Sequence, residues 1–316
     1  MTTIYRNLNP GQGAMLLMGN DTQSWMKKLL VPGLRHFQKR FYWRDLEPTK
    51  DSYNFTELAS DIAWCAANGC LLTVMIQDKT FGPGAHPLPK GMENFELVNH
   101  AGTAANPGQA GLTSKRWDPA VAAQFNKLTA KLAQFDGMAG FNGVATCETA
   151  LSLDMADLTA HGYTPELYRD SYKAILIAAA KNLPRSNIYW TMNFLVKNQA
   201  YIADIADAVR PYGVQMGGPD CLPNSASLLT AAYPFYAQFK GRIRLFIQVS
   251  PPGYAVPDAD GPGKFLTMTD ILNFAKDTLF VNTMFWYPIA QPSDPSKGYG
   301  WNDAAAVIAA NPIINP

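Results

Sequence analysis

The chain has 316 residues, of which 47% are hydrophobic and 16% are charged, and its formal net charge is +1. This near-neutral balance gives no reason to expect nucleic acid or an anionic membrane surface as a partner. No apolar run approaches the roughly 20 residues that a membrane-spanning helix needs, so we expect a globular chain with a large core.

Apolar runs alternate with helical patterns along the chain. Most of the runs are nearly continuous in apolar residues, which is typical of strands covered on both faces. The predicted strands, in chain order, are 13–19, 37–47, 71–78, 141–148, 187–193, 213–220, 242–249 and 278–287. The predicted helices between and after them are centred on 25–29, 55–65, 121–135, 165–175, 202–209, 228–239, 270–274 and 304–310.

Helix boundaries carry recognisable signals. Asp118 followed by Pro119 predicts an N-cap with proline in the first turn, and Thr164 with Pro165 repeats the pattern. The segment 79–117 interrupts the alternation and is rich in Gly, Pro, Asn and His. A connection of that length is usually functional or disordered.

About eight strand–helix units predict an α/β fold, the (β/α)8 TIM barrel, as a single domain over residues 1–316 with long loops at the carboxyl ends of the strands. The alternative is a doubly wound sheet. It is disfavoured because no GxGxxG sequence follows any predicted strand.

In a barrel the chemistry lies at the carboxyl ends of the strands. Arginine, carboxyl, amide and aromatic side chains at such positions suit recognition of a polyhydroxylated ring. The residues that close the predicted strands are Arg40, Trp43, Asp78, Glu148, Asn193, Asp220, Gln248, Trp286 and Tyr287.

Residues 40–70 carry a more specific pattern. Arg40 and Trp43 precede Leu46-Glu47-Pro48, and Tyr53-Asn-Phe55 follows. This order resembles the second-strand signature of clan A glycoside hydrolases, which are retaining (β/α)8 enzymes that act on oligo- or polysaccharides. The resemblance implies an acid/base glutamate at the end of strand four, matching Glu148, and a nucleophilic glutamate at the end of strand seven. It also implies that Arg40 steadies the nucleophile and that Trp286 forms the floor of a sugar subsite.

Two positions depart from the clan pattern. Cys147 stands where the clan has asparagine before the acid/base glutamate, so the amide contact to the sugar would come from elsewhere, with Asn193 as a candidate. Gln248 stands at the nucleophile position. A retaining mechanism needs two carboxyl groups about 5 to 5.5 Å apart, and an amide is a poor nucleophile.

Three explanations for Gln248 remain open. The active form of the enzyme carries glutamate at position 248; or Glu148 works with Asp220 or Asp78 in an inverting arrangement, with carboxyls roughly 6.5 to 9.5 Å apart; or the barrel binds carbohydrate without catalysis.

Several candidates also have structural interpretations. Arg40 can pair with a neighbouring acid, Trp43 can belong to the core because strand side chains alternate between faces, and Asp78 can cap the following loop. Glu47 precedes a proline and is expected to be a structural or rim carboxylate.

The remaining expectations concern cofactors and compartment. Cys65, Cys70, Cys147 and Cys221 form no CxxC pair and, with four scattered histidines, no zinc spacing. We therefore expect buried free thiols, no metal site and no cofactor. No basic segment followed by an apolar segment marks a signal peptide at the start of the chain, and the sequence leaves compartment and oligomeric state open.

Overall fold

The computed structural model describes residues 11–17, 22–99, 110–195, 198–261 and 263–316. Its strands are β1 (Gln12–Leu16), β2 (His36–Tyr42), β3 (Leu71–Gln77), β4 (Glu96–Val98), β5 (Leu112–Ser114), β6 (Phe141–Thr146), β7 (Asn187–Thr191), β8 (Val214–Gly218), β9 (Leu245–Val249) and β10 (Thr283–Trp286). Its α-helices are α1 (Gln23–Leu29), α2 (Trp43–Leu46), α3 (Thr56–Ala67), α4 (Pro119–Leu132), α5 (Met155–Ala160), α6 (Pro165–Asn182), α7 (Tyr201–Val209), α8 (Ala226–Ala231), α9 (Tyr233–Phe239), α10 (Met268–Asn273) and α11 (Trp301–Ala310).

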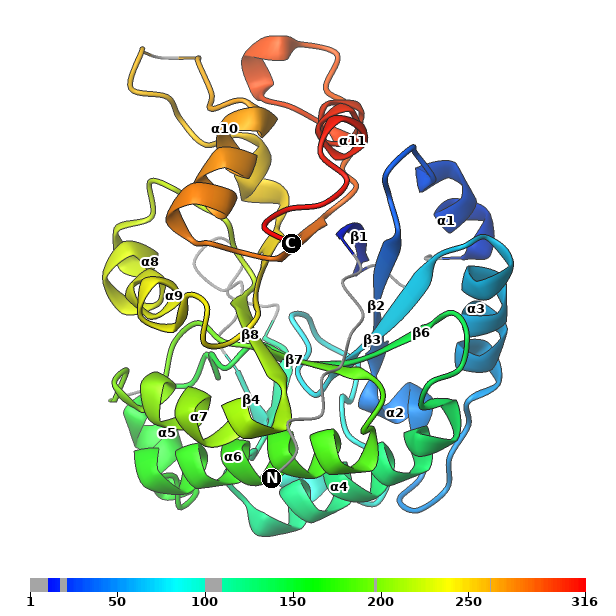
Figure 1. Ribbon diagram of the computed structural model, residues 1–316. Coiled ribbons are helices and arrows are strands. Elements are labelled where there is room, and N and C mark those ends of the chain that lie inside the picture. The colour runs from blue at the N-terminus through cyan, green and yellow to red at the C-terminus, as the bar shows by residue number, and fades with distance from the viewer. Residues whose placement is uncertain (1–10, 18–21, 100–109, 196–197, 262) are drawn as a thin grey trace.

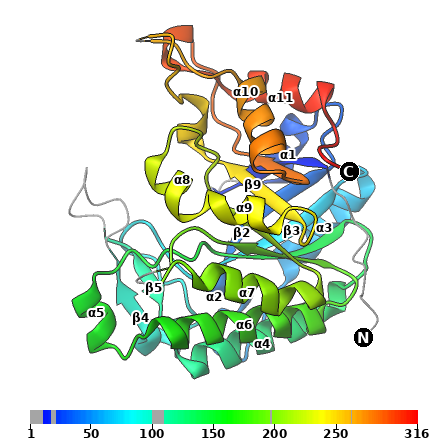
Figure 2. The ribbon, with the colours of Figure 1, turned by 60° about the vertical axis from the view of Figure 1, so that its left-hand side comes forward.

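Eight parallel strands close into a barrel in the order β1-β10-β9-β8-β7-β6-β3-β2 (Figure 1). Helices surround it, with α10 and α11 on the opposite side from α4 and α6 in both views (Figure 2). The predicted (β/α)8 fold is therefore confirmed. Glu148 follows the fourth barrel strand, β6, and Gln248 lies on the seventh, β9.

The barrel interior is a small core separate from the one under the helices. Side chains from six different strands fill it, with Leu17 and Tyr287 packed against them, and the six are Met15, Met75, Ala145, Tyr189, Phe246 and Phe285. Because strand side chains alternate between faces, these residues fix which neighbours point into the barrel. On β10, Phe285 points inward and Trp286 belongs to the outer core.

A polar cluster lies at the level of Tyr189 inside the barrel. His36 Nε2 and Thr73 Oγ1 are 2.6 Å apart, and the Asn142 amide nitrogen donates to Thr73 Oγ1 and to the Tyr189 hydroxyl. Complete burial lowers the pKa of His36 to about 3, so the imidazole is neutral at physiological pH.

One glycine sets how closely β6 and β7 approach. Gly143 has a φ of 143°, and a Cβ at this position would lie 1.8 Å from the backbone oxygen of Asn187. A side chain here would collide with β7, and the register of β6 against β3 shifts next to the same point.

The predicted elements differ from the observed ones in local detail. The second strand ends at Tyr42, and Trp43 begins helix α2, where a single strand up to Pro48 was expected. The helix expected at 228–239 is two helices, α8 and α9, and α5 was not predicted. The long segment 79–117 contains the antiparallel pair β4–β5. The end of the first predicted strand, residues 18 and 19, lies outside the described residues.

Two other findings concern the whole described part of the chain. It contains no helix that is both long and apolar enough to cross a membrane. The four cysteines are buried free thiols, as expected.

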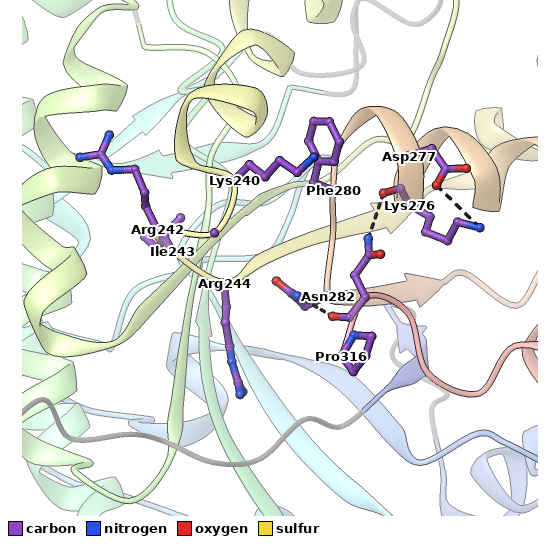
Figure 3. A pocket seen from close by; sticks show the side chains of 11 residues that line it. Lys240, Arg242, Ile243, Arg244, Lys276, Asp277, Phe280, Asn282 and Pro316 are labelled. Atoms are coloured by element: carbon purple, nitrogen blue, oxygen red, sulfur yellow. Dashed lines mark hydrogen bonds and ion pairs between the residues drawn. The ribbon is translucent and has the colours of Figure 1, made fainter.

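A cavity of about 650 Å³ lies at the amino-terminal end of β9 and β10, the end remote from Glu148. Lys240, Arg242, Arg244 and Lys276 are among the residues that line it. Figure 3 shows Arg242, Arg244 and Lys276 pointing in different directions, so these cations do not converge on one point.

Candidate active site

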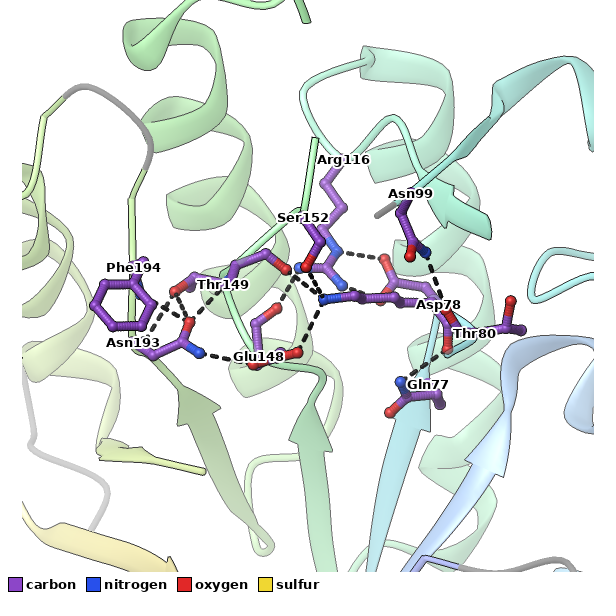
Figure 4. A network of polar contacts seen from close by, with 12 residues as sticks. Gln77, Asp78, Thr80, Asn99, Arg116, Glu148, Thr149, Ser152, Asn193 and Phe194 are labelled. Carbon is purple, nitrogen blue, oxygen red and sulfur yellow. Dashed lines mark hydrogen bonds and ion pairs between the residues drawn. The ribbon is translucent and has the colours of Figure 1, made fainter. Parts of the chain in front are cut away.

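Glu148 lies two residues beyond β6, where the chain leaves the barrel. Both of its carboxylate oxygens are held: Lys79 Nζ donates to Oε1 over 2.9 Å, and Asn193 Nδ2 donates to Oε2 over 2.7 Å (Figure 4). The side chain keeps 18% of its surface exposed. The carboxylate is therefore positioned by two neighbouring strand ends and remains open to a ligand.

The Asn193 amide has only one consistent orientation. Its Oδ1 accepts hydrogen bonds from the backbone N–H of Ala150 (2.9 Å) and of Phe194 (2.7 Å), and from Thr149 Oγ1 (3.0 Å). Because backbone N–H groups can only donate, the amide nitrogen must face Glu148. Asn193 thus supplies Glu148 with a fixed donor.

Lys79 is the counter-ion of Glu148, and only 1% of its side chain is exposed. An ammonium carries three N–H donors, and three acceptors surround this one. Besides Glu148, Lys79 Nζ donates to the backbone oxygen of Ala150 over 3.0 Å and to Ser152 Oγ over 2.9 Å. Lys79 is therefore a buried lysine whose three N–H donors all have acceptors.

Behind Glu148 lies a second ion pair, between Asp78 and Arg116. Arg116 Nε and Nη2 donate to the two Asp78 oxygens over 2.6 and 2.7 Å, and Nη1 donates to the backbone oxygen of Glu148. Although burial opposes the charge of Arg116, attraction to Asp78 raises its pKa. This pair supports the backbone of the Glu148 segment from the helix side.

The position of Asp78 corrects one expectation. Asp78 was expected to contact sugar or to serve as a second carboxyl. Together with Trp43 and Arg116 it instead lines a small internal cavity of about 20 Å³ that also borders α4 and α6. The Asp78 carboxylate accepts hydrogen bonds from Arg116 and Ser114. Asp78 faces the helices because Ile76 and Asp78 share the outer side of their strand.

Asp220 follows β8 and is another acidic side chain near Glu148. Burial is the main cause that raises its pKa, and the negative charge of Glu148 raises it further, against a hydrogen bond from Ser250 Oγ that favours the anion. Glu148 and Asp220 therefore lie close enough to influence each other, and they sit in contrasting surroundings.

Gln248 points into the barrel directly above Phe246. Its Nε2 donates to Gln38 Oε1 over 2.6 Å, and only 1% of the residue is exposed. The amide nitrogen of Gln38 is buried without a hydrogen-bond partner in the described part of the protein. Gln38 is thus a neighbour of the proposed nucleophile position that no sequence pattern had singled out.

Two of the predicted aromatic contacts are corrected. Trp286 is completely buried in the outer core, where its Nε1 donates to Gln12 Oε1 over 2.7 Å. Trp43 is equally buried and donates to Glu47 Oε2 over 2.7 Å. Neither ring is available for stacking on a sugar. Glu47 is a buried structural carboxylate, one of the two roles expected for it.

Two other predicted residues are half-buried around the mouth of the barrel. Tyr287 packs on the interior core, in the place expected of Trp286. The Arg40 guanidinium lies 5.3 Å from the ring centre of Tyr42 and makes no hydrogen bond or ion pair with any described residue. In place of Arg40, Gln38 contacts Gln248.

An exposed aromatic ring near Glu148 also escaped the sequence patterns. Phe81 is 44% exposed, and Lys79 Nζ lies 5.0 Å from its ring centre. The available signal was position: Lys79 and Phe81 directly follow a strand end, but neither was singled out within the long segment that they open. The described residues contain no group of three or more His, Cys, Asp or Glu side chains that could hold a metal ion.

Comparison with known proteins finds similarity at the level of the fold. No protein-family model matches the chain, and no curated protein matches its sequence. Among solved structures, β-galactosidase from the psychrophilic Marinomonas ef1 has a TM-score of 0.58 at 10% identity, and the alignment covers 94% of this chain and 59% of that one. The catalytic domain of β-amylase from Paenibacillus polymyxa has a TM-score of 0.60 at 9% identity, with 95% and 98% covered.

A third structure, the exo-β-1,4-mannosidase Op5Man5 from Opitutaceae bacterium strain TAV5, has a TM-score of 0.57 at 14% identity, with 95% and 59% covered. This chain thus spans about three fifths of the length of the β-galactosidase and of the mannosidase. At such identities the likeness establishes a shared fold: the chain is a (β/α)8 barrel that resembles glycoside hydrolases.

Proposed function

We propose that this protein is a glycoside hydrolase that cleaves O-glycosidic bonds of an oligo- or polysaccharide, with Glu148 and Asp220 as its two carboxyl groups. One observation carries the assignment. Glu148 is bound by Lys79 and Asn193, whereas burial and the charge of Glu148 raise the pKa of Asp220. A carboxyl group with a raised pKa beside a second carboxyl group that is paired with a lysine is an arrangement that acid–base cleavage of a glycoside can use.

In this mechanism Asp220 holds the proton and donates it to the departing glycosidic oxygen. Glu148, positioned by Lys79, takes a proton from the attacking water, which reaches the anomeric carbon from the opposite face. Cleavage then inverts the anomeric configuration. Asn193 keeps Glu148 in position, and Arg40, Tyr287 and the exposed ring of Phe81 contact the sugar.

A second candidate is the retaining mechanism with glutamate at position 248. There Glu148 protonates the leaving oxygen and later activates water, while residue 248 attacks the anomeric carbon. The unpartnered amide nitrogen of Gln38 favours this alternative. If Gln38 turned its amide over, it would donate a hydrogen bond to a carboxylate at position 248.

Substitutions at the three positions separate these candidates. Glu148→Gln, Asp220→Asn and Gln248→Glu would be assayed on cello-, manno- and malto-oligosaccharides, with mass detection of products and NMR of the first anomer released. Glu166→Gln is the matched control, because Glu166 is exposed at the start of α6 and accepts a hydrogen bond from the hydroxyl of the half-buried Tyr201.

If the Asp220 mechanism holds, the unaltered chain releases inverted products, and Glu148→Gln and Asp220→Asn each lower kcat by about 100-fold or more. Activity that emerges only in Gln248→Glu, with retained configuration, supports the second candidate and refutes the first. Binding of oligosaccharides without turnover by every variant would make the protein a carbohydrate-binding barrel and refute both mechanisms.

A further inference from the structure

A groove of about 950 Å³ opens beside the carboxyl end of β2. Its walls come from the start of α1, from β2 and from α3, and Gln23, Lys39, Arg40, Tyr42, Glu57 and Asp61 are among its lining residues. Arg40 and Tyr42 share the inward-facing side of β2 with Gln38, which contacts Gln248. The groove therefore begins at the rim of the barrel mouth and leads away from it.

Lys39 and two acidic side chains form ion pairs in the lining of the groove. Lys39 Nζ donates to Asp61 Oδ2 over 2.6 Å and to Glu57 Oε1 over 2.7 Å, and the side chains of Lys39 and Asp61 are almost fully buried. Although burial opposes its charge, these bonds raise the pKa of Lys39. Gln23 Nε2 donates to Asp61 Oδ1 over 3.1 Å and links α1 to α3. Polar atoms fixed in this way can orient a ligand without first being ordered.

The rim of the groove holds donors without acceptors. Arg40 makes no hydrogen bond or ion pair within the described part of the chain, and its guanidinium lies over the Tyr42 ring. An arginine carries five N–H donors in one plane, and a half-buried guanidinium gains from acceptors that a ligand brings. A planar donor set on an aromatic ring offers both hydrogen bonds and a flat face.

The balance of charge selects the class of ligand. Lys39 and Arg40 face three acidic groups, Asp45, Glu57 and Asp61, in the same groove. The net charge of −1 disfavours phosphate, sulfate or nucleic acid. Hydroxyl groups both donate and accept, so a neutral sugar chain satisfies this mixture of fixed donors and acceptors.

We propose that this groove binds the sugar units of a neutral polysaccharide that lie beyond the unit at the barrel mouth. The proposal rests on the proposed glycosidase function and adds to it an extended, uncharged substrate and a path for that substrate over β2. The volume of the groove lies at the upper end of the roughly 300 to 1,000 Å³ found for ligand pockets. This size suits several sugar units better than a single one.

Chain-length dependence of binding tests the groove separately from the chemistry. Dissociation constants would be measured by calorimetry for cello-, manno- and malto-oligosaccharides of two to six units, in the Glu148→Gln variant so that the ligands stay intact. Ser60→Trp fills the groove, because Ser60 lines it. Ala63→Trp, on an exposed part of the same helix outside the groove, is the matched control.

We expect the hexasaccharide of one series to bind about tenfold more tightly than its disaccharide. In Ser60→Trp and in Arg40→Met the two dissociation constants should become equal. In Ala63→Trp the tenfold difference should remain. Equal affinity for two and six sugar units, or an unchanged ratio of affinities in Ser60→Trp, refutes the proposed role of the groove but not the proposed hydrolase function. Failure to bind any of the three series counts against the proposed function itself.

Discussion

Replacing Lys79 by methionine tests whether the buried ion pair organises the site. Methionine has similar length and keeps the apolar stem, but it removes the ammonium that donates to Glu148, Ala150 and Ser152. The change therefore leaves a carboxylate, a backbone carbonyl and a hydroxyl without their shared donor, in a place where 1% of the lysine side chain is exposed.

The expected cost is about 3 kcal/mol of unfolding free energy. Breaking a fully buried pair by removing one partner costs roughly 3 to 5 kcal/mol, and the lower end applies because Glu148 keeps 18% of its surface exposed and water can solvate it in part. In the double variant with Glu148→Gln the penalty should shrink by about 1 to 2 kcal/mol, since no uncompensated charge remains.

Urea denaturation followed by circular dichroism measures these free energies. Lys127→Met is the matched control, because Lys127 and Asp51 form a 2.9 Å pair in which both side chains are about half exposed. Such a surface pair contributes little to stability, because water and salt screen it. If Lys79→Met costs no more than Lys127→Met, or if the double variant shows no coupling, Lys79 does not act as the counter-ion of Glu148.

Three further predictions concern pH and the aromatic residues. The raised pKa of Asp220 means that the carboxyl group holds its proton more tightly in the folded state than in the unfolded state, so ionisation of Asp220 destabilises the fold. Asp220→Asn should therefore raise Tm at pH 7. The gain in Tm should vanish below the ordinary aspartate pKa of about 3.9. His36 has the opposite dependence, because the unfolded chain takes up its proton below about 6.5 and the folded chain only near 3. Relative to His36→Gln, the unaltered protein should lose about 1.4 kcal/mol of stability per pH unit below 6.5, and a constant difference in urea denaturation would show that His36 is not buried as a neutral ring. Trp43→Phe should lower the unfolding free energy by about 1 kcal/mol, because it removes the hydrogen bond to Glu47, and it should not change the affinity for oligosaccharides. Phe81→Ala should weaken that affinity and change Tm by no more than about 2 °C. Calorimetry that gave the reverse would show that Phe81 does not belong to the site.

The order of strands and helices was predictable because each apolar run is covered on both faces and each helix has a regular apolar stripe. For the same reason, the sequence could not predict whether the Trp286 side chain points into the barrel or toward the helices. In a strand that is apolar on both sides, the sequence does not reveal which of two neighbouring residues points inward, and Phe285 and Tyr287 take the interior positions.

Other features depended on contacts that no local pattern encodes. Trp43 was assigned to a strand, but helix α2 starts at that residue and turns its ring toward Glu47. The partners of Glu148, Lys79 and Asn193, come from two different strand ends, 69 and 45 residues away along the chain. Glu148 could be selected by its place after the fourth strand, whereas Lys79 looked like the first residue of a polar loop.

Lys79 and Arg116 stand near the two ends of the long connection between β3 and α4, and both reach the same glutamate. Lys79 donates to the Glu148 carboxylate and Arg116 to its backbone oxygen. The connection is thus attached to Glu148 near both of its ends. Because closing a longer flexible loop between fixed points costs only about 0.6 kcal/mol for each doubling of its length, a change in the length of this connection between the two anchors should leave the Glu148 carboxylate where it is.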